Sequence, residues 1–199
     1  MRPLSDYNSI PEYTKVKKIP AGAYEVLIKR AEEKEINGSI FLYILFDISD
    51  GEYKNFFMDK FMADRKNYPE TAKFKGIIRF QYPDGKNPDD EGRKKRMKTA
   101  LEYIKRSNNL NADFSKEWDG AILKDCKAGM IFRDEEYDYN GYHGMSARPY
   151  CFIDLEDFKA GKYTVPEPKY LSGKASASVP VNSSVPSQSV DELVEDLPF

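Results

Sequence analysis

Aromatic and lysine side chains are interleaved in two neighbouring segments in the first third of the chain. The first segment, "SIFLYILFDIS", is apolar on both faces if it forms a strand, and its second face carries Phe41 and Tyr43. The next segment, "YKNFFMDKF", adds Lys54, Phe56 and Lys60. Rings exposed on a sheet can stack unpaired bases, each base worth about 1–3 kcal/mol, and nearby lysines can bind phosphates. The same rings could pack under a helix or in a subunit interface, and for any single ring the pattern favours that packing.

A second group of rings and cations surrounds Asn140-Gly141, a dipeptide that strongly indicates a β-hairpin. Its members are Arg133, Tyr137, Tyr139, Tyr142, His143 and Arg148. Such side chains on a hairpin loop can contact nucleic acid, although tyrosine is also common in strands for packing reasons alone. Four acids between residues 134 and 138 weaken the electrostatic argument for a polyanion at this hairpin.

The sequence finishes with "DELVEDLPF", in which acids precede a Leu-Pro-Phe tripeptide. The candidate partner-binding residues are Asp191, Glu192, Glu195, Asp196, Leu197, Pro198 and Phe199. A basic pocket on a partner could bind the terminal carboxylate while an apolar slot receives the proline and phenylalanine rings. An acidic solubilising tail is the alternative, but such a tail does not need to finish with Pro-Phe.

Few residues suggest catalysis or metal binding. His143 is the sole histidine, Cys126 and Cys151 are too far apart for a Cys-x-x-Cys motif, and neither GxxxxGKS/T nor GxGxxG occurs. Carboxylates are numerous, but none stands out as a paired site. We therefore expect a protein that is not an enzyme and that holds no metal and no cofactor. The two cysteines are expected to be buried free thiols.

Hydrophobic periodicity predicts the elements that would position these side chains. "AGAYEVLIKRAEEKE" and "SIFLYILFDIS" predict two strands joined by a turn at Asn37-Gly38. "YKNFFMDKF" predicts a third strand, whereas residues 64–90 are less regular. The segment "EGRKKRMKTALEYIKRSNN" predicts a helix whose core-facing residues are Met97, Ala100, Leu101 and Ile104. Two further strands flank Asn140-Gly141.

Three strands, a helix and two strands is the order of an OB-fold. This fold is a mainly β, five-stranded Greek-key barrel with a helix between its third and fourth strands, although other small α+β folds share the order. We expect residues 1–171 to form this domain. Residues 172–199 are rich in Ser, Val, Pro and Ala, and they are predicted to be a disordered linker that leads to the acidic tip.

Charge is divided unevenly between these two parts. One lysine and four acids give residues 172–199 a net charge of −3, and the remaining residues carry +1. A near-neutral domain can still present a basic stripe, and the helix lysines Lys94, Lys95 and Lys98 are either such a stripe or a solvated surface. The chain shows neither a signal peptide nor an apolar stretch long enough to span a membrane, so we expect a cytoplasmic protein without membrane contact.

Several segments resemble known single-stranded-DNA-binding proteins. The sequence "DELVEDLPF" is similar to the acidic tip of the bacterial proteins of this function. Across residues 19–171 the chain resembles a family of such proteins from phages and mobile elements, in the segments "IPAGAYEVLIKRAEEKE", "LFDISDGEYKNFF", "KGIIRFQYPDGK", "KKRMKTALEYIKRSNN" and "FKAGKYTVPEPKYL". The resemblance implies an OB-fold that coats unpaired DNA and a tip that recruits replication, recombination or repair proteins. The only tryptophan, Trp118, is expected in the core, so tyrosine and phenylalanine would have to stack the bases.

Two functions are favoured by the sequence, and an enzyme of nucleic-acid metabolism is a third possibility, for which we expect no activity. We expect a protein that binds single-stranded DNA with little sequence preference and docks DNA-processing proteins through residues 191–199. The alternative is an adaptor that binds a host replication or recombination factor through its tail without binding DNA itself. A domain of this size offers a short binding track, so a homo-oligomer would help to coat long strands. Because an acidic tail and a basic groove attract each other, the tail is also a candidate inhibitor of DNA binding.

Overall fold

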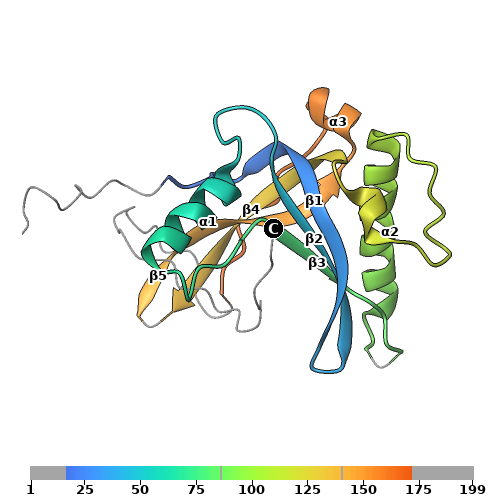
Figure 1. Ribbon diagram of the computed structural model, residues 1–199, viewed down its shortest axis with the longest axis horizontal. Coiled ribbons are helices and arrows are strands. Elements are labelled where there is room, and N and C mark those ends of the chain that lie inside the picture. The colour runs from blue at the N-terminus through green and yellow to red at the C-terminus, as the bar shows by residue number, and fades with distance from the viewer. Residues whose placement is uncertain (1–16, 86, 140, 172–199) are drawn as a thin grey trace, which may run out of the picture.

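The computed structural model describes residues 17–85, 87–139 and 141–171 of the 199-residue chain. Its elements, in chain order, are β1 (Gly22–Ile36), β2 (Ser39–Ile48), α1 (Phe56–Asn67), β3 (Ile77–Gln81), α2 (Asp90–Ser107), the short 3-10 helix η1 (Gly120–Leu123), β4 (Lys127–Tyr139), β5 (Tyr142–Ile153) and α3 (Leu155–Lys159). Figure 1 shows α1 and α2 on opposite sides of the sheet. Within the described residues no helix has both the length and the apolar character needed to cross a membrane.

The five strands form one antiparallel sheet in the order β3-β2-β1-β4-β5. This arrangement confirms the predicted mainly β class and the helix between the third and fourth strands. The edge strands β3 and β5 approach each other, but no ladder joins them in the described part of the chain. The sheet is therefore open.

The prediction of a strand in "YKNFFMDKF" is wrong, because Phe56 begins helix α1 and Lys54 lies in the turn before it. The third strand is β3, which comes from the stretch that was predicted to be less regular. The carboxylate of Asp47 explains the helix, since its two oxygens accept hydrogen bonds from the backbone N–H groups of Phe57 (3.0 Å) and Met58 (2.9 Å). These donors belong to the first turn of α1 and have no partner within the helix.

The core includes residues from both faces of β2. Along β2, all residues from Leu42 to Ile48 are buried, so the predicted core row is buried and the opposite face of this part of the strand is covered as well. The ring of Phe46 lies at the centre, with ring centroids 5.7 Å from Phe57, 6.2 Å from Phe132 and 6.4 Å from Phe152. These rings join β2, α1, β4 and β5 into one apolar cluster, and edge-to-face contacts of this kind add about 0.5–1.5 kcal/mol each to the burial of the rings.

Helix α2 covers another part of the core. Its four buried residues are Met97, Ala100, Leu101 and Ile104, which are the four that the helical spacing predicted. Trp118 was expected in the core, but it is only partly buried: it packs against the edge of the core, with its ring centroid 5.0 Å from that of Phe114. Both cysteines are free, with Cys126 buried and Cys151 half-buried.

Strands β4 and β5 continue beyond the rest of the sheet as a two-stranded arm. Strand β1 pairs with β4 only as far as Phe132, whereas β4 and β5 remain paired to Tyr139 and Tyr142. We call residues 133–139 and 142–148 the β4–β5 arm. A register shift between Ile131 and Phe132 marks its base, and a bulge at such a point increases the local bend and twist of a strand.

Candidate nucleic-acid interface

The face of β1, β2 and β3 that carries Phe41 and Tyr43 is the first part of the candidate interface, and we call it the outer sheet face. Two cross-strand rows are set by the pairing, with Lys34, Phe41 and Gln81 in the first row and Glu32, Tyr43 and Arg79 in the second. Phe41 is half-buried, and its ring lies 6.3 Å from that of Tyr43. The sheet thus places cations beside rings, as expected for contacts with unpaired bases and phosphates.

Tyr43, a candidate stacking ring, instead follows the packing alternative. Its side chain is only 3% exposed, and the Lys34 ammonium group lies 5.6 Å from the centre of its ring. Burial leaves no ring face for a base in this arrangement, so Tyr43 acts as part of the packing. Glu32 lies between Arg30 (2.6 Å) and Lys34 (3.2 Å) and offsets part of the positive charge on this face.

A cluster of cations adjoins α1 and forms the second part of the candidate interface. We call Lys60 on α1, Lys75 before β3 and Arg148 on β5 the α1 cation cluster. The three residues are close enough for Lys60 and Arg148 to lower the pKa of Lys75, whose burial is the largest cause of its fall to about 8. Burial also lowers the pKa of Lys60, and Arg148 acts in the same direction.

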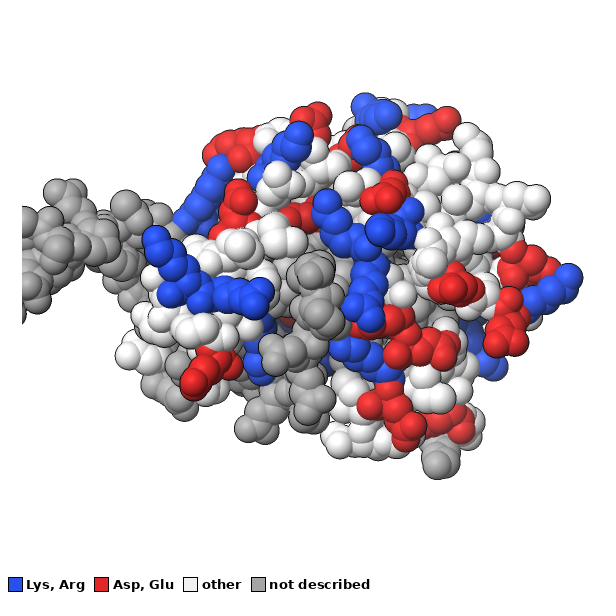
Figure 2. Space-filling view, viewed as in Figure 1, with Lys and Arg blue, Asp and Glu red and all other residues white. Residues whose placement is uncertain are grey.

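The charges around this cluster are mainly positive. Lys73 adds to the effect on Lys75, and Lys18 adds to the effect on Lys60, whereas the carboxylate of Asp64 opposes both. Figure 2 shows lysine and arginine side chains gathered over α1 and over the middle of the sheet. Like charges at short range disfavour their own charged forms, so a polyanion at this position would be bound favourably.

Lys54 and Phe56, which were also predicted to bind DNA, lie outside the three groups of residues described above and below. Lys54 is exposed in the turn before α1. Phe56 is half-buried, and its ring contacts those of Tyr53 (6.2 Å) and Phe57 (5.1 Å). Its surroundings are those of a packing residue at the start of the helix rather than of an exposed ring.

The β4–β5 arm is the third part of the interface, and its two faces differ. Because successive side chains in a strand point to opposite faces, Arg133 and Tyr137 share one face of β4, and the pairing places Arg148 of β5 directly opposite Arg133. Asp134, Glu136 and Asp138 belong to the other face. Three of the four acids that weakened the electrostatic argument therefore face away from the cations.

Arg133 is occupied by contacts within the arm. Its guanidinium group forms an ion pair with Glu135 and lies 4.6 Å from the centre of the Tyr150 ring. Tyr137 and Tyr139 are half-buried, whereas Tyr142 is 51% exposed at the tip. Arg148 is exposed. The structure thus brings Lys60 and Arg148 together, while Arg133 is better placed to orient Tyr150 than to bind a phosphate.

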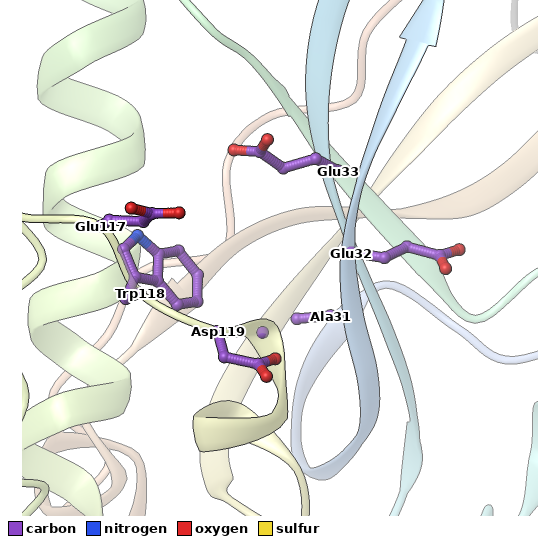
Figure 3. A pocket seen from close by; sticks show the side chains of 7 residues that line it. Ala31, Glu32, Glu33, Glu117, Trp118 and Asp119 are labelled. Carbon is purple, nitrogen blue, oxygen red and sulfur yellow. The ribbon is translucent and has the colours of Figure 1, made fainter.

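The acidic hollow on the other side of β1 is a poor place for a nucleic acid. It measures about 670 Å³ and is lined by Ala31, Glu32, Glu33, Glu117, Trp118, Asp119 and Gly120. Figure 3 shows Glu33 and Glu117 directed toward the Trp118 ring, whereas Glu32 points away. A polyanion would be repelled by these carboxylates.

Sequence reasoning missed Lys75, Lys73 and Gly144. The two lysines belong to a stretch without clear periodicity, and their proximity to Arg148 arises only from the order of the strands. Gly144 pairs with Tyr137 across the arm, and only the register of the hairpin could have indicated it. The predicted partner-binding residues 191–199 lie outside the described residues.

Comparisons with known proteins do not identify a family for this chain. No protein-family model matches the chain, and no curated protein is similar to it. In the part of the chain that the structure describes, no group of three or more His, Cys, Asp or Glu side chains is arranged to hold a metal ion. The functional argument therefore depends on the interface itself.

Proposed function

We propose that this protein binds single-stranded DNA with little sequence preference along the outer sheet face, the α1 cation cluster and the β4–β5 arm. The observation that carries the proposal is the α1 cation cluster, in which cations from α1, from the segment before β3 and from β5 converge. Phosphate contacts supply most of the affinity in non-specific binding. The neighbouring rings favour a single strand, because stacking needs bases that are not already stacked in a duplex.

The strand order supports a finer proposal about the fold. An antiparallel sheet in the order β3-β2-β1-β4-β5, with a helix between the third and fourth strands, is compatible with a partly open OB barrel. We propose that the approach of β3 to β5 completes such a barrel. The resemblance of residues 19–171 to single-stranded-DNA-binding proteins of phages and mobile elements points the same way.

A second element of the proposed function concerns the acidic segment 191–199. We propose that it recruits replication, recombination or repair proteins, with its acids meeting a basic pocket and its apolar residues an adjoining slot. The support for this step is the sequence alone.

Fluorescence titration with a labelled oligo-dT tests the proposal. The full chain and a chain cut at Ser172 should both bind, and the logarithm of the affinity should fall linearly with the logarithm of the salt concentration. A duplex of equal length should bind more weakly. An absence of oligo-dT binding at low salt, with retained binding of a host replication factor, would replace the proposal with the adaptor function.

A further inference from the structure

We infer that the Arg133 face of the β4–β5 arm is a nucleotide subsite. In this subsite Tyr137 stacks on one base, and Arg148, with Lys60 of the α1 cation cluster, binds a neighbouring phosphate of the same strand. The inference rests on the proposed function and names the side chains that would bind the bases and the backbone.

The position of the Tyr137 ring is fixed by the absence of a side chain at Gly144. The two residues are directly paired across the arm. A Cβ atom at position 144 would lie 2.7 Å from the Tyr137 hydroxyl oxygen and 2.9 Å from its Cζ atom. The ring therefore occupies the space above the Cα of Gly144, where it lies against the opposite strand.

The glycine is not required by the backbone. Gly144 is absent from the described residues with positive φ, whereas Gly141 in the adjoining turn has a φ of 80°. Glycine weakens a strand interior and often marks a close approach, and an aromatic side chain laid across a cross-strand glycine recovers part of the lost packing. The close approach here is that of Tyr137, whose half-buried ring keeps part of its surface available to a base.

The cation of this subsite is Arg148 rather than Arg133. Glu135 and Tyr150 both contact the guanidinium group of Arg133. Arg148 lies on the same face, exposed, four residues from Gly144 along β5. Four residues of a strand span about 13 Å, a distance that the long arginine side chain and one nucleotide can bridge together. The charge of Glu135 is offset by Arg133 and opposes this phosphate only weakly.

The subsite is continuous with the α1 cation cluster, because Arg148 belongs to both. The charge of Arg148 is close enough to Lys60 and Lys75 to lower the pKa of both lysines. A strand whose base stacks on Tyr137 can therefore continue its backbone over Arg148 toward α1. Loss of the ring should therefore change the affinity at fixed salt, whereas loss of a cation should change the salt dependence of binding.

Substitution of Tyr137 tests the ring in the full chain. Tyr137→Leu should weaken oligo-dT binding about tenfold at fixed salt with an unchanged salt slope, since stacking on a ring is worth about 1–3 kcal/mol per base. Tyr137→Phe should bind as the unaltered protein does. Tyr103→Leu is the matched control, because Tyr103 is another half-buried tyrosine beside an arginine, Arg106, on α2, and its affinity should not change.

Gly144→Ala tests whether Gly144 positions the Tyr137 ring or only affects the stability of the β4–β5 arm. The added methyl group meets the flexible end of the Tyr137 side chain, so the ring should move while the arm remains folded. The affinity should fall about threefold, and the same change in the Tyr137→Leu background should have no further effect. A loss of equal size in both backgrounds would show that Gly144 does not act through Tyr137 and would overturn this step.

The cation is tested by the salt dependence of binding. Arg148→Gln should reduce the slope of log affinity against log salt by about one, whereas Lys116→Gln, at an exposed lysine outside the proposed interface, should leave it unchanged. Crosslinking of an oligonucleotide that contains 5-iodouracil to the unaltered protein should map to Tyr137. Crosslinks confined to other residues, or equal binding by Tyr137→Leu and Tyr103→Leu, would overturn the subsite while leaving DNA binding intact. Failure of the unaltered chain to bind oligo-dT would overturn both proposals.

Discussion

Lys75 is the residue at which binding and stability are expected to conflict. Burial first, and then Lys60, lower the pKa of Lys75 to about 8, so its charged form is disfavoured in the folded protein. An unfolded lysine titrates near 10.5. Below pH 8 both states are charged and the folded protein bears the full penalty. Between pH 8 and 10.5 the unfolded state holds more protons, so the penalty is progressively relieved as the pH rises.

Lys75→Met should therefore stabilise the protein without DNA and weaken its binding of DNA. At pH 7 we expect a gain of about 1 kcal/mol, less than the full shift implies because the side chain is not fully buried, and a rise in Tm of about 2–4 °C. Thermal unfolding at pH 7 and pH 10 checks the sign, since the difference between variant and unaltered protein should shrink at pH 10. An equal difference at both pH values, or an equal gain for Lys98→Met on α2, would contradict the explanation.

At the scale of elements, α1 is the segment that the sequence did not reveal. The spacing on α2 predicted its buried face, because burial there follows the helical period, whereas residues 42–48 of β2 are buried on both faces. The helix α1 depends on Asp47, which is the one buried charged residue among those described and lies nine residues before Phe56. No local pattern reports such a contact, and adjacent aromatic residues are equally suited to a strand.

The candidate interface, like the fold, could be predicted only in part from the sequence. The turn dipeptides at 37–38 and 140–141 predicted the two hairpins, and with them the cations of the β4–β5 arm. Tyr43 was misjudged because alternation shows only that two faces of a strand are apolar, and not which of them other residues cover. The meeting of Lys60, Lys75 and Arg148 requires the order of the strands, which single-sequence patterns do not determine.

Asp47→Ala tests whether the buried cap holds α1 in place. The change removes the acceptors of the Phe57 and Met58 N–H groups and also the 2.8 Å bond from Ile48. We expect a loss of about 3 kcal/mol in the free energy of unfolding, because buried donors would be left unsatisfied. Urea denaturation measures it. The control is Asp119→Ala, which removes an exposed cap that accepts from Ala121 and should cost about 1 kcal/mol.

The same variant should weaken oligo-dT binding at temperatures where it remains folded, because α1 carries Lys60. A loss of stability without any loss of affinity would show that α1 is not part of the interface. A stability change no larger than that of Asp119→Ala would show instead that the carboxylate is not needed for the helix.

At the scale of the whole molecule, the domain is joined to the acidic segment at a defined point. The backbone of Lys169 pairs with β4 through hydrogen bonds to Asp134 and from Glu136, each 2.8 Å long. The Leu171 N–H donates to the Glu136 side chain at 3.0 Å. The described part of the chain therefore ends, at Leu171, beside the β4–β5 arm.

Removal of residues 191–199 should tighten oligo-dT binding at low salt. The deleted segment carries four acids, which compete with phosphates for the same cations through long-range attraction. The gain should be about threefold to tenfold at low ionic strength and should disappear at several hundred millimolar salt, where the Debye length is only a few ångströms. A chain that keeps the acids but carries Leu197→Ala and Phe199→Ala should bind as the unaltered chain does, since charge rather than apolar contact is responsible. If deletion leaves the low-salt affinity unchanged, the acidic segment does not compete with DNA, and its role is confined to partners.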